Sequence, residues 1–420
     1  MYFWEAISTI QSGKEGARQM VQPGASAGAH RQRLLAALEH REPDRVPLDL
    51  GSTRVTGCTL AAYRQLRSYL GLPAVEPVCI DPIQQLAQVE EDVLQMLDVD
   101  TRGVFIGAPD GYCATIETHS GVEEYRDEWG VRRRRPPDSF YFDLTESPFA
   151  GDPPDLGWLD QHPWPDPSDP GRYRGLHEQV TALQAAGEYA VVFSPASGPL
   201  HITQYLRGFE GWYTDFVLNP AFLEGLFEHV FDFTCTVAER SLRLIGDQVD
   251  VVVVGDDLGT QRGPQVSPDF YRRFIKPYHR RLLDVYHAHS TGRVLLHSCG
   301  SLVELLPDLI EIGVDILNPV QVTAAGMDPA RLKRQFGKHL SFWGGIDTHR
   351  VLPHGSPADV RREVARRITE LGQGGGYVVN SVHNVQPDVP PANVVAMFAA
   401  AHELGAYEMA QAVATQEPNE

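Results

Sequence analysis

A histidine and a cysteine stand two positions apart in His297-Ser-Cys-Gly300, at the end of an apolar run. Side chains at i and i+2 of an extended strand point to the same side, so His297 and Cys299 can share a metal ion. Imidazole and thiolate suit Zn²⁺, and a catalytic zinc has three protein ligands and an open position. The sequence offers His383 and Asp257 as rival third ligands. The alternative is that His297 and Cys299 are ordinary core residues.

Further polar residues follow other apolar runs. Asp256 and Asp257 come after four consecutive valines, where a carboxylate could accept a proton, orient a ligand histidine or bind a substrate cation. The alternative for this pair is a turn and N-cap before a helix that starts at Pro268. The candidates for binding substrate are Arg54, Ser197, Asn318, Gln321, Asp347, Asn380 and Asn384.

Eight short apolar segments, separated mostly by helical patterns, could position these residues. The predicted strands are 45–51, 101–106, 189–194, 249–255, 293–297, 314–318, 339–343 and 377–380. The predicted helices are 31–40, 220–245, 268–289, 302–312, 329–336 and 357–371. Short apolar strands that alternate with helices are typical of a parallel sheet covered on both faces, and eight of them predict an α/β fold, a closed (β/α)8 TIM barrel. A doubly wound open sheet is the alternative. In a barrel, the loops after the strands would bring the polar residues to one mouth.

The remaining segments suggest a single barrel domain with additions. Residues 1–30 are rich in small residues and predict a flexible N-terminal arm, residues 31–410 form the barrel, and 411–420 are a tail. Residues 115–141 predict a β-hairpin insertion, followed by a Pro-rich loop to residue 170. In this hairpin the run Arg132–Arg135 would alternate between the barrel mouth and solvent.

Composition excludes several classes of function. The 420 residues carry 36 Lys and Arg against 55 Asp and Glu, a formal charge of −19, which argues against nucleic-acid binding and disfavours a polyanionic substrate. Five scattered cysteines fit reduced thiols rather than a disulfide framework. We expect no membrane association and a cytoplasmic location, because no segment has the pattern of a membrane span or a secretory signal.

Several motifs in order resemble the uroporphyrinogen decarboxylase superfamily. They are His297-Ser-Cys-Gly300, Asp256-Asp-Leu-Gly-Thr-Gln261, Trp343-Gly-Gly-Ile-Asp347 and Asn380-Ser-Val-His-Asn-Val-Gln-Pro-Asp-Val-Pro-Pro391, with Glu42-Pro-Asp-Arg-Val-Pro47 near the start. The resemblance runs from about Arg31 to about Gly405. It implies a (β/α)8 barrel and one of two chemistries. These are cofactor-free decarboxylation of a porphyrinogen, and zinc-dependent transfer of a methyl group between a corrinoid protein and a thiol or pterin acceptor.

The motifs favour the methyltransferase branch. The decarboxylases carry an Arg-Gln-Ala-Gly-Arg segment that holds substrate carboxylates, whereas the corresponding segment 49–57 has only Arg54 as a basic residue. The methyltransferases bind zinc through His-x-Cys-Gly and a later Cys. His297 and Cys299 match the first two ligands, and His383 stands at the later position.

The resemblance also implies roles for other residues and for a partner. Asp256 and Asp257 would orient His297 or an amine of the acceptor. The chain lacks the Asp-x-His-x-x-Gly signature of cobalamin domains, because Leu352 stands where Gly is needed after Asp347 and His349. A separate corrinoid protein is therefore implied. The alternatives are a porphyrinogen-type decarboxylase, a different barrel lyase or hydrolase, and a non-catalytic corrinoid-handling partner.

Overall fold

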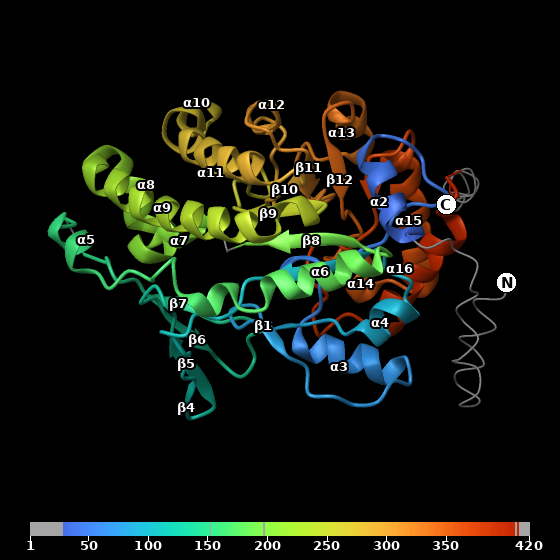
Figure 1. Cartoon of the computed structure of the whole chain (residues 1–420), viewed down its shortest axis with the longest axis horizontal. Coiled ribbons are helices and arrows are strands. Elements are labelled where there is room, and N and C mark those ends of the chain that lie inside the picture. The colour runs from blue at the N-terminus through green and yellow to red at the C-terminus, as the bar shows by residue number, and fades with distance from the viewer. Residues whose placement is uncertain (1–27, 152, 196–197, 408–409, 411–420) are drawn as a thin grey trace.

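The core of the molecule is a curled parallel sheet of seven strands in the order β13-β12-β11-β10-β9-β8-β3 (Figure 1). The computed structural model describes residues 28–151, 153–195, 198–407 and 410. The strands are β3 (Thr101–Phe105), β8 (Ala190–Ser194), β9 (Val251–Gly255), β10 (Arg293–His297), β11 (Ile316–Asn318), β12 (Ser341–Trp343) and β13 (Tyr377–Val378). Their residues are buried almost throughout, which explains the continuous apolar runs.

Residues 46–50 close the sheet into a barrel between its two edge strands. Leu48 forms an isolated parallel bridge with Val379, and the backbone N–H of Val379 donates to the carbonyl of Pro47 at 2.9 Å. On the other side, the N–H of Asp100 donates to the carbonyl of Leu48 at 3.0 Å. The (β/α)8 barrel is thus confirmed, although its first predicted strand is reduced to a bridge. Pro47 has no N–H to extend the ladder.

Inside the barrel, apolar side chains from alternate strand positions form one cluster with two residues of α2 (Ala29–Leu38), Leu34 and Leu38. The strand residues of this cluster are Ala190, Val192, Val251, Val253, Leu295, Ile316, Trp343 and Val378. Helix α2 therefore packs against the barrel interior, and the polar residues are left to the opposite, C-terminal ends of the strands. Among the described residues, no helix is both long and apolar enough to cross a membrane.

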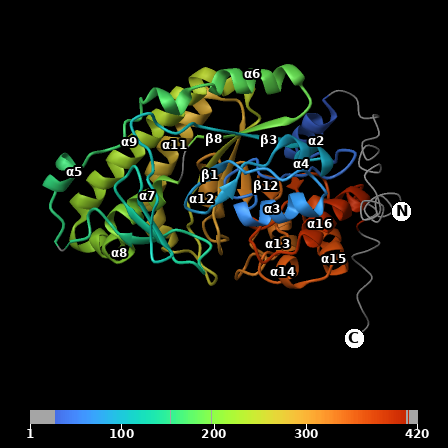
Figure 2. The same ribbon diagram turned by 90° about the horizontal axis from the view of Figure 1, so that it is seen from below.

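Helices cover the outside of the sheet. Figure 2 shows α9 and α11 side by side on one flank and α13 to α16 gathered on the other. The main helices are α3 (Leu60–Tyr69), α4 (Glu91–Met96), α6 (Leu176–Ala186), α7 (Pro199–Arg207), α8 (Phe209–Leu218), α9 (Pro220–Ile245), α11 (Lys276–His289), α12 (Leu306–Glu311), α13 (Pro329–Phe336), α15 (Pro357–Arg367) and α16 (Pro391–Leu404). Shorter ones are α5 (Gly157–Gln161), α10 (Pro268–Phe270) and α14 (Val351–His354).

The predicted helices differ from these in a few places. Helices 220–245 and 329–336 are confirmed to the residue, whereas the helix predicted at 302–312 spans only α12. The helices predicted at 268–289 and 357–371 each contain a single π-helical turn, at Tyr271–Ile275 and Ile368–Gly372. Single turns of 3-10 helix lie at Pro170–Tyr173 and Gly246–Gln248. Of the predicted arm, residues 1–27 lie outside the described part, and Ala29 and His30 belong to α2. The predicted tail 411–420 also lies outside it.

The insertion is larger than the predicted hairpin. It is a four-stranded antiparallel sheet of β4 (Glu117–His119), β5 (Val122–Arg126), β6 (Arg132–Arg135) and β7 (Asp143–Glu146), which projects from the barrel in Figure 1. Strand β7 and helix α5 fall in the segment that was predicted as a Pro-rich loop. Alternating apolar residues are nearly absent from β7, of which three residues are exposed, so the sequence carried little strand signal. A second small sheet pairs β1 (Cys79–Asp81) with β2 (Leu86–Ala87).

Candidate metal centre

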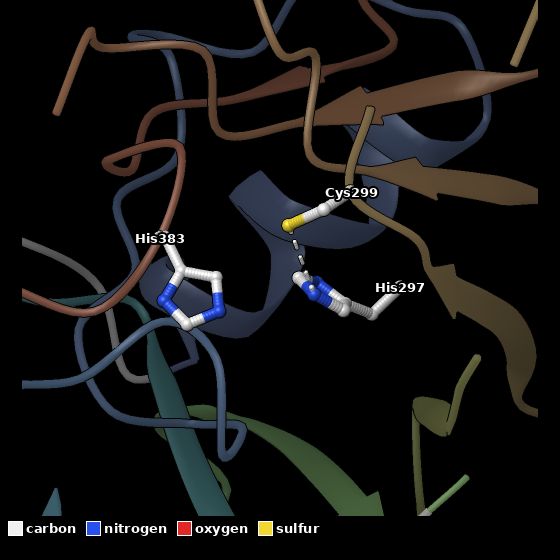
Figure 3. Close-up of side chains that lie close together, drawn as sticks. All are labelled: His297, Cys299 and His383. Carbon is white, nitrogen blue, oxygen red and sulfur yellow. Dashed lines mark hydrogen bonds between the residues drawn. The ribbon is translucent and has the colours of Figure 1, made fainter. Parts of the chain in front are cut away.

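Three side chains with metal-binding atoms point toward one another beyond the strand ends: His297, Cys299 and His383 (Figure 3). The Nε2 atom of His297 lies 3.7 Å from the Sγ atom of Cys299, and the rings of His297 and His383 are 5.6 Å apart. One ligand atom from each residue lies within 4.8 Å of the others. Tetrahedral zinc at its usual bond lengths separates a nitrogen and a sulfur ligand by about 3.5 Å. The donor set and its spacing therefore fit zinc.

The ends of two neighbouring strands position His297. It is the last residue of β10 and lies in register with Asn318, the last residue of β11. The Nδ1 atom of His297 is 2.6 Å from Oδ1 of Asn318, and Nδ2 of Asn318 donates to the carbonyl of Trp343 at 3.1 Å. The contact between Nδ1 of His297 and Asn318 orients the ring so that Nε2 points toward Cys299. The hydrogen-bond partner of a metal-bound histidine has the same role. Asn318, predicted to bind substrate, is fully buried and contacts the candidate ligand.

Cys299 is placed by the turn that follows β10. Gly300 adopts a φ of +89°, and a Cβ atom there would lie 2.4 Å from the carbonyl carbon of Gly259. Only glycine is suited to both the conformation and the close approach. The N–H of Gly300 donates to Oε1 of Gln321 at 2.6 Å, so Gln321 holds this turn.

Asp257 lies directly beside the cluster. Its Oδ1 atom accepts the backbone N–H of Cys299 at 2.6 Å and is 3.9 Å from Nε2 of His297. Its Oδ2 atom is 3.7 Å from Nε2 of His201. Burial raises the pKa of Asp257, whereas His297, His201 and the hydrogen bond from the Cys299 N–H lower it. The lowering effects together are larger, so the pKa lies below its ordinary value. The carboxylate is therefore ionised at neutral pH.

Asp256 is separated from the cluster, unlike its neighbour. It is fully buried, and its Oδ2 atom is 3.1 Å from Nε2 of His279, whose Nδ1 is 3.2 Å from the hydroxyl of Tyr271. Its Oδ1 atom accepts the backbone N–H of His201 at 3.2 Å. The side chain of Asp256 thus joins α7 to α11 beneath the site, whereas Asp257 is the carboxylate that faces His297.

Burial sets the protonation of the three candidate ligands. It lowers the pKa of His297, and together with the nearby His297 it lowers the pKa of His383 to about 4. Both imidazoles are therefore neutral at pH 7, as metal ligands must be. Burial, with Asp257 nearby, raises the pKa of the Cys299 thiol well above its usual range. A thiolate at this position needs a cation to stabilise it.

A cavity of about 570 Å³ opens beside the cluster, and His297, His383 and Asp257 line it. The insertion supplies much of the opposite wall, with Asp127, Trp129, Val131, Arg133, Tyr141, Phe142, Asp143 and Leu144. The insertion is therefore part of the binding site. Of the four arginines predicted to alternate, Arg133 faces this cavity, and its Nε donates to Asp127 at 2.9 Å.

The remaining predicted substrate-binding residues differ in where they lie. Arg54 lines the cavity. The side chains of Asp347, Asn380 and Asn384 hold the exit loops together. For example, Nδ2 of Asn380 donates to the carbonyl of Asp49 at 2.7 Å, and Oδ1 of Asp347 accepts the N–H of His349 at 2.7 Å. Ser197 lies outside the described residues.

Sequence reasoning did not identify several residues of the site. His201 and Tyr205 lie one turn apart on α7 and line the cavity, with their rings stacked at 5.8 Å and 8°. His279 on α11 is buried against Asp256. The dipeptide Gly198-Pro199, which starts α7, is the signal that could have predicted this helix and its cavity-facing His201.

Comparison with known proteins identifies a family for the chain. Residues 144–404 match the family model "Uroporphyrinogen decarboxylase (URO-D)". A uroporphyrinogen decarboxylase of Pseudomonas aeruginosa is 33% identical over 147 residues, which is 34% of this chain and 39% of that protein. One from Alkalilimnicola ehrlichii is 25% identical over 376 residues, 89% of this chain and 93% of that protein.

A solved structure described as a methyltransferase from Methanosarcina mazei has the same fold. It superposes with a TM-score of 0.58 at 18% identity, covering 89% of this chain and 98% of its own. The family model alone spans more than half of the sequence, at residues 144–404 of 420. The chain belongs to the uroporphyrinogen decarboxylase (URO-D) family.

Proposed function

We propose that this chain is a zinc-dependent methyltransferase that moves a methyl group between a corrinoid protein and a thiol or pterin acceptor. One observation carries the proposal: His297, Cys299 and His383 place one imidazole nitrogen or thiol sulfur each within 4.8 Å of the others, next to a cavity. Three ligands beside an open space are what a catalytic zinc requires, whereas a structural zinc is closed by four.

Zinc held there would supply a Lewis acid that stabilises the thiolate of a thiol acceptor at neutral pH. The residues of the chain would do the rest. Asn318 keeps Nε2 of His297 directed at the site, and Asp257 anchors the backbone N–H of Cys299. Methyl transfer depends on alignment of acceptor and donor more than on proton transfer, so rigid placement of these groups is the main requirement.

Decarboxylation of a porphyrinogen is the competing function, because the curated relatives named above carry that name. The charge of the cavity argues against it. In the described part of the wall the arginines are Arg54 and Arg133, and Arg133 is already paired with Asp127. Asp81, Asp143 and Asp257 also line the cavity. A substrate with many carboxylates would meet repulsion here.

Metal content and activity test the proposal together. We expect close to one zinc per chain in the purified protein and a large loss in Cys299→Ala, with transfer of methyl from methylcobalamin to a thiol lost in parallel. The control is Cys113→Ala, because Cys113 is an exposed free thiol. Equal zinc in the parent and in Cys299→Ala would refute the proposal. Decarboxylation of uroporphyrinogen at a substantial rate by the metal-free protein would establish the competing function instead.

A further inference from the structure

A second cavity, here called the N-terminal cavity, lies at the N-terminal ends of the barrel strands. It has a volume of about 450 Å³. Arg293 on its wall begins β10, whereas the candidate metal ligand His297 ends the same strand. The N-terminal cavity is therefore separate from the metal centre. The other residues that line it are Leu38, Glu39, His40, Asp315, Ile316, Lys338, His339 and Ser341.

Basic side chains gather at the N-terminal cavity. Arg293, Lys338 and His339 line it together with His40. Burial lowers the pKa of His40, and the nearby Lys333, Arg293 and His339 lower it further, so these groups are close enough to act on its ring. The whole chain has a formal charge of −19, so this local excess of basic groups runs against its composition. Basic groups that repel one another are stabilised when an anion joins them.

Two of these basic groups approach one point inside the protein. A Cβ atom on Gly376 would lie 2.9 Å from Nδ1 of His40 and 3.3 Å from Nζ of Lys333. Nδ1 of His40 is buried without a hydrogen-bond partner. Nζ of Lys333 donates to the carbonyl of Gly375 at 2.5 Å, and no carboxylate of the described residues lies within ion-pair distance of it. Burial lowers the pKa of Lys333 to about 8 although Glu42 is nearby, so its positive charge is incompletely balanced.

The two acids on the wall of the N-terminal cavity are engaged by other groups. Glu39 pairs with Arg41. Oδ2 of Asp315 accepts a backbone N–H of β10 at 2.8 Å, and its Oδ1 lies 3.4 Å from Arg293. By contrast, the side chain of Lys338 makes no hydrogen bond or ion pair with any other described residue. These acids therefore leave part of the positive charge at the cavity without a partner.

We propose that the N-terminal cavity binds a phosphate group, either as the free ion or as part of a small phosphorylated molecule. Arg293 and Lys338 would donate to its oxygens, and His40 and Lys333 would add positive charge from the protein side. Phosphate is largely a dianion at neutral pH and has several acceptor oxygens, so it suits basic groups that come from separate elements. The volume of the cavity exceeds what a phosphate group fills and leaves room for the rest of a phosphorylated molecule.

Calorimetric titration with inorganic phosphate, at an ionic strength of about 0.15 M set with sodium chloride, tests the inference. We expect saturable binding of a single phosphate that chloride does not prevent. Lys338→Gln should weaken this binding about 10-fold, because it removes one charge-assisted contact. The matched control is Arg334→Gln, which removes the same charge from an exposed position of α13 outside the cavity wall. We expect it to change the affinity less than about twofold.

Absence of saturable binding would overturn the inference, and so would equal losses in the two variants. Titration of zinc-loaded and chelator-treated protein should give the same affinity, because the N-terminal cavity and the metal centre lie at opposite ends of the strands. Phosphate binding that disappears with zinc would assign it to the metal centre and refute the site proposed here. Titration with glycerol 3-phosphate identifies the source of the phosphate group. Tighter binding of the ester supports a phosphorylated molecule as the ligand, and tighter binding of inorganic phosphate supports the free ion.

Discussion

At the scale of single residues, the third metal ligand is the sharpest question, since His383 and Asp257 both lie beside His297 and Cys299. His383 belongs to the group of facing ligand atoms, whereas Asp257 is occupied by the N–H of Cys299. We expect His383→Ala to lower zinc affinity by orders of magnitude, His383→Cys to restore binding, and Asp257→Asn to keep the metal. Elemental analysis of the three variants measures their zinc content. A full zinc complement in His383→Ala, with loss in Asp257→Asn, would make Asp257 the ligand.

Asn318 should matter for the metal although it does not belong to the group of facing ligand atoms. Its Oδ1 is 2.6 Å from Nδ1 of His297, so Asn318→Ala would leave the ring free to rotate and its Nδ1 buried without a partner. We expect zinc affinity to fall about 10- to 100-fold, as for other partners of metal-bound histidines. Competition with a chelator measures the zinc Kd. Asn318→Asp keeps an acceptor at the same place and serves as the matched variant, and an unchanged Kd in Asn318→Ala would contradict the assignment.

Local geometry decides which site residues could be predicted from the sequence. The sequence could predict the positions of His297, Cys299 and Asp257, because a strand end and an i, i+2 spacing place them directly. It was equally clear that Asn318 lies at the end of a strand. The sequence did not show whether its side chain would face the cavity or form a hydrogen bond with a neighbouring residue. That depends on side-chain direction within the packed barrel. His201 was missed because its approach to Asp257 brings α7 to the loop after β9, and that approach exists only in the folded chain.

At the scale of elements, burial determines how well the sequence predicts structure. Strands buried on both faces appeared as apolar runs, and α9 and α13, each with proline in the first turn, were predicted to the residue. Helix α16 was missed, because it is buried nearly all round and its apolar residues show little periodicity. The insertion was underestimated for the opposite reason, since strands such as β4 are wholly exposed.

The loops that leave β9 and β10 meet at Gly259, which gives a test at this scale. A Cβ atom on Gly259 would lie 2.6 Å from the carbonyl oxygen of Cys299 and 2.8 Å from the nitrogen of Ser301. We expect Gly259→Ala to push the Cys299 turn away, to reduce zinc content and to cost about 1 to 3 kcal/mol of stability. Gly263→Ala is the matched control in the same loop, because a Cβ there meets nothing within 4 Å. Zinc content and Tm should separate the two variants, and identical behaviour would contradict the packing argument.

At the scale of the whole molecule, a buried charge cluster at the end away from the cavity links the elements that close the barrel. Asp100, just before β3, pairs with Arg33 of α2 and with Arg45 at 2.7 Å, and it accepts the N–H of Leu48 at 2.7 Å. One carboxylate therefore links α2, the bridge segment and β3. The first strand of the barrel is reduced to a bridge at Leu48 and forms few backbone hydrogen bonds. The side-chain contacts of Asp100 stabilise it in their place.

Replacing this carboxylate should destabilise the fold without touching the metal. Asp100→Asn removes the negative charge that balances the buried guanidinium groups of Arg33 and Arg45. We expect the free energy of unfolding, measured in urea at pH 7, to fall by about 3 to 5 kcal/mol. The zinc content per folded chain should stay unchanged. Asp98→Asn is the control. Asp98 also pairs with Arg45, but its side chain is half exposed, so the loss should stay below about 1 kcal/mol. Equal losses in the two variants would contradict a special role for Asp100.

The same cluster predicts a pH dependence with a definite sign. Burial raises the pKa of Asp100, but Arg45, His30 and Arg33 lower it more, so the folded pKa lies well below its ordinary value. In the unfolded chain the pKa of this carboxyl is about 3.9. Its contribution is therefore complete above about pH 5 and is lost as the pH falls from there toward the folded pKa. Urea unfolding between pH 7 and pH 3 should show a steeper acid decline for the parent than for Asp100→Asn. Parallel pH profiles would show that the cluster does not depend on this charge.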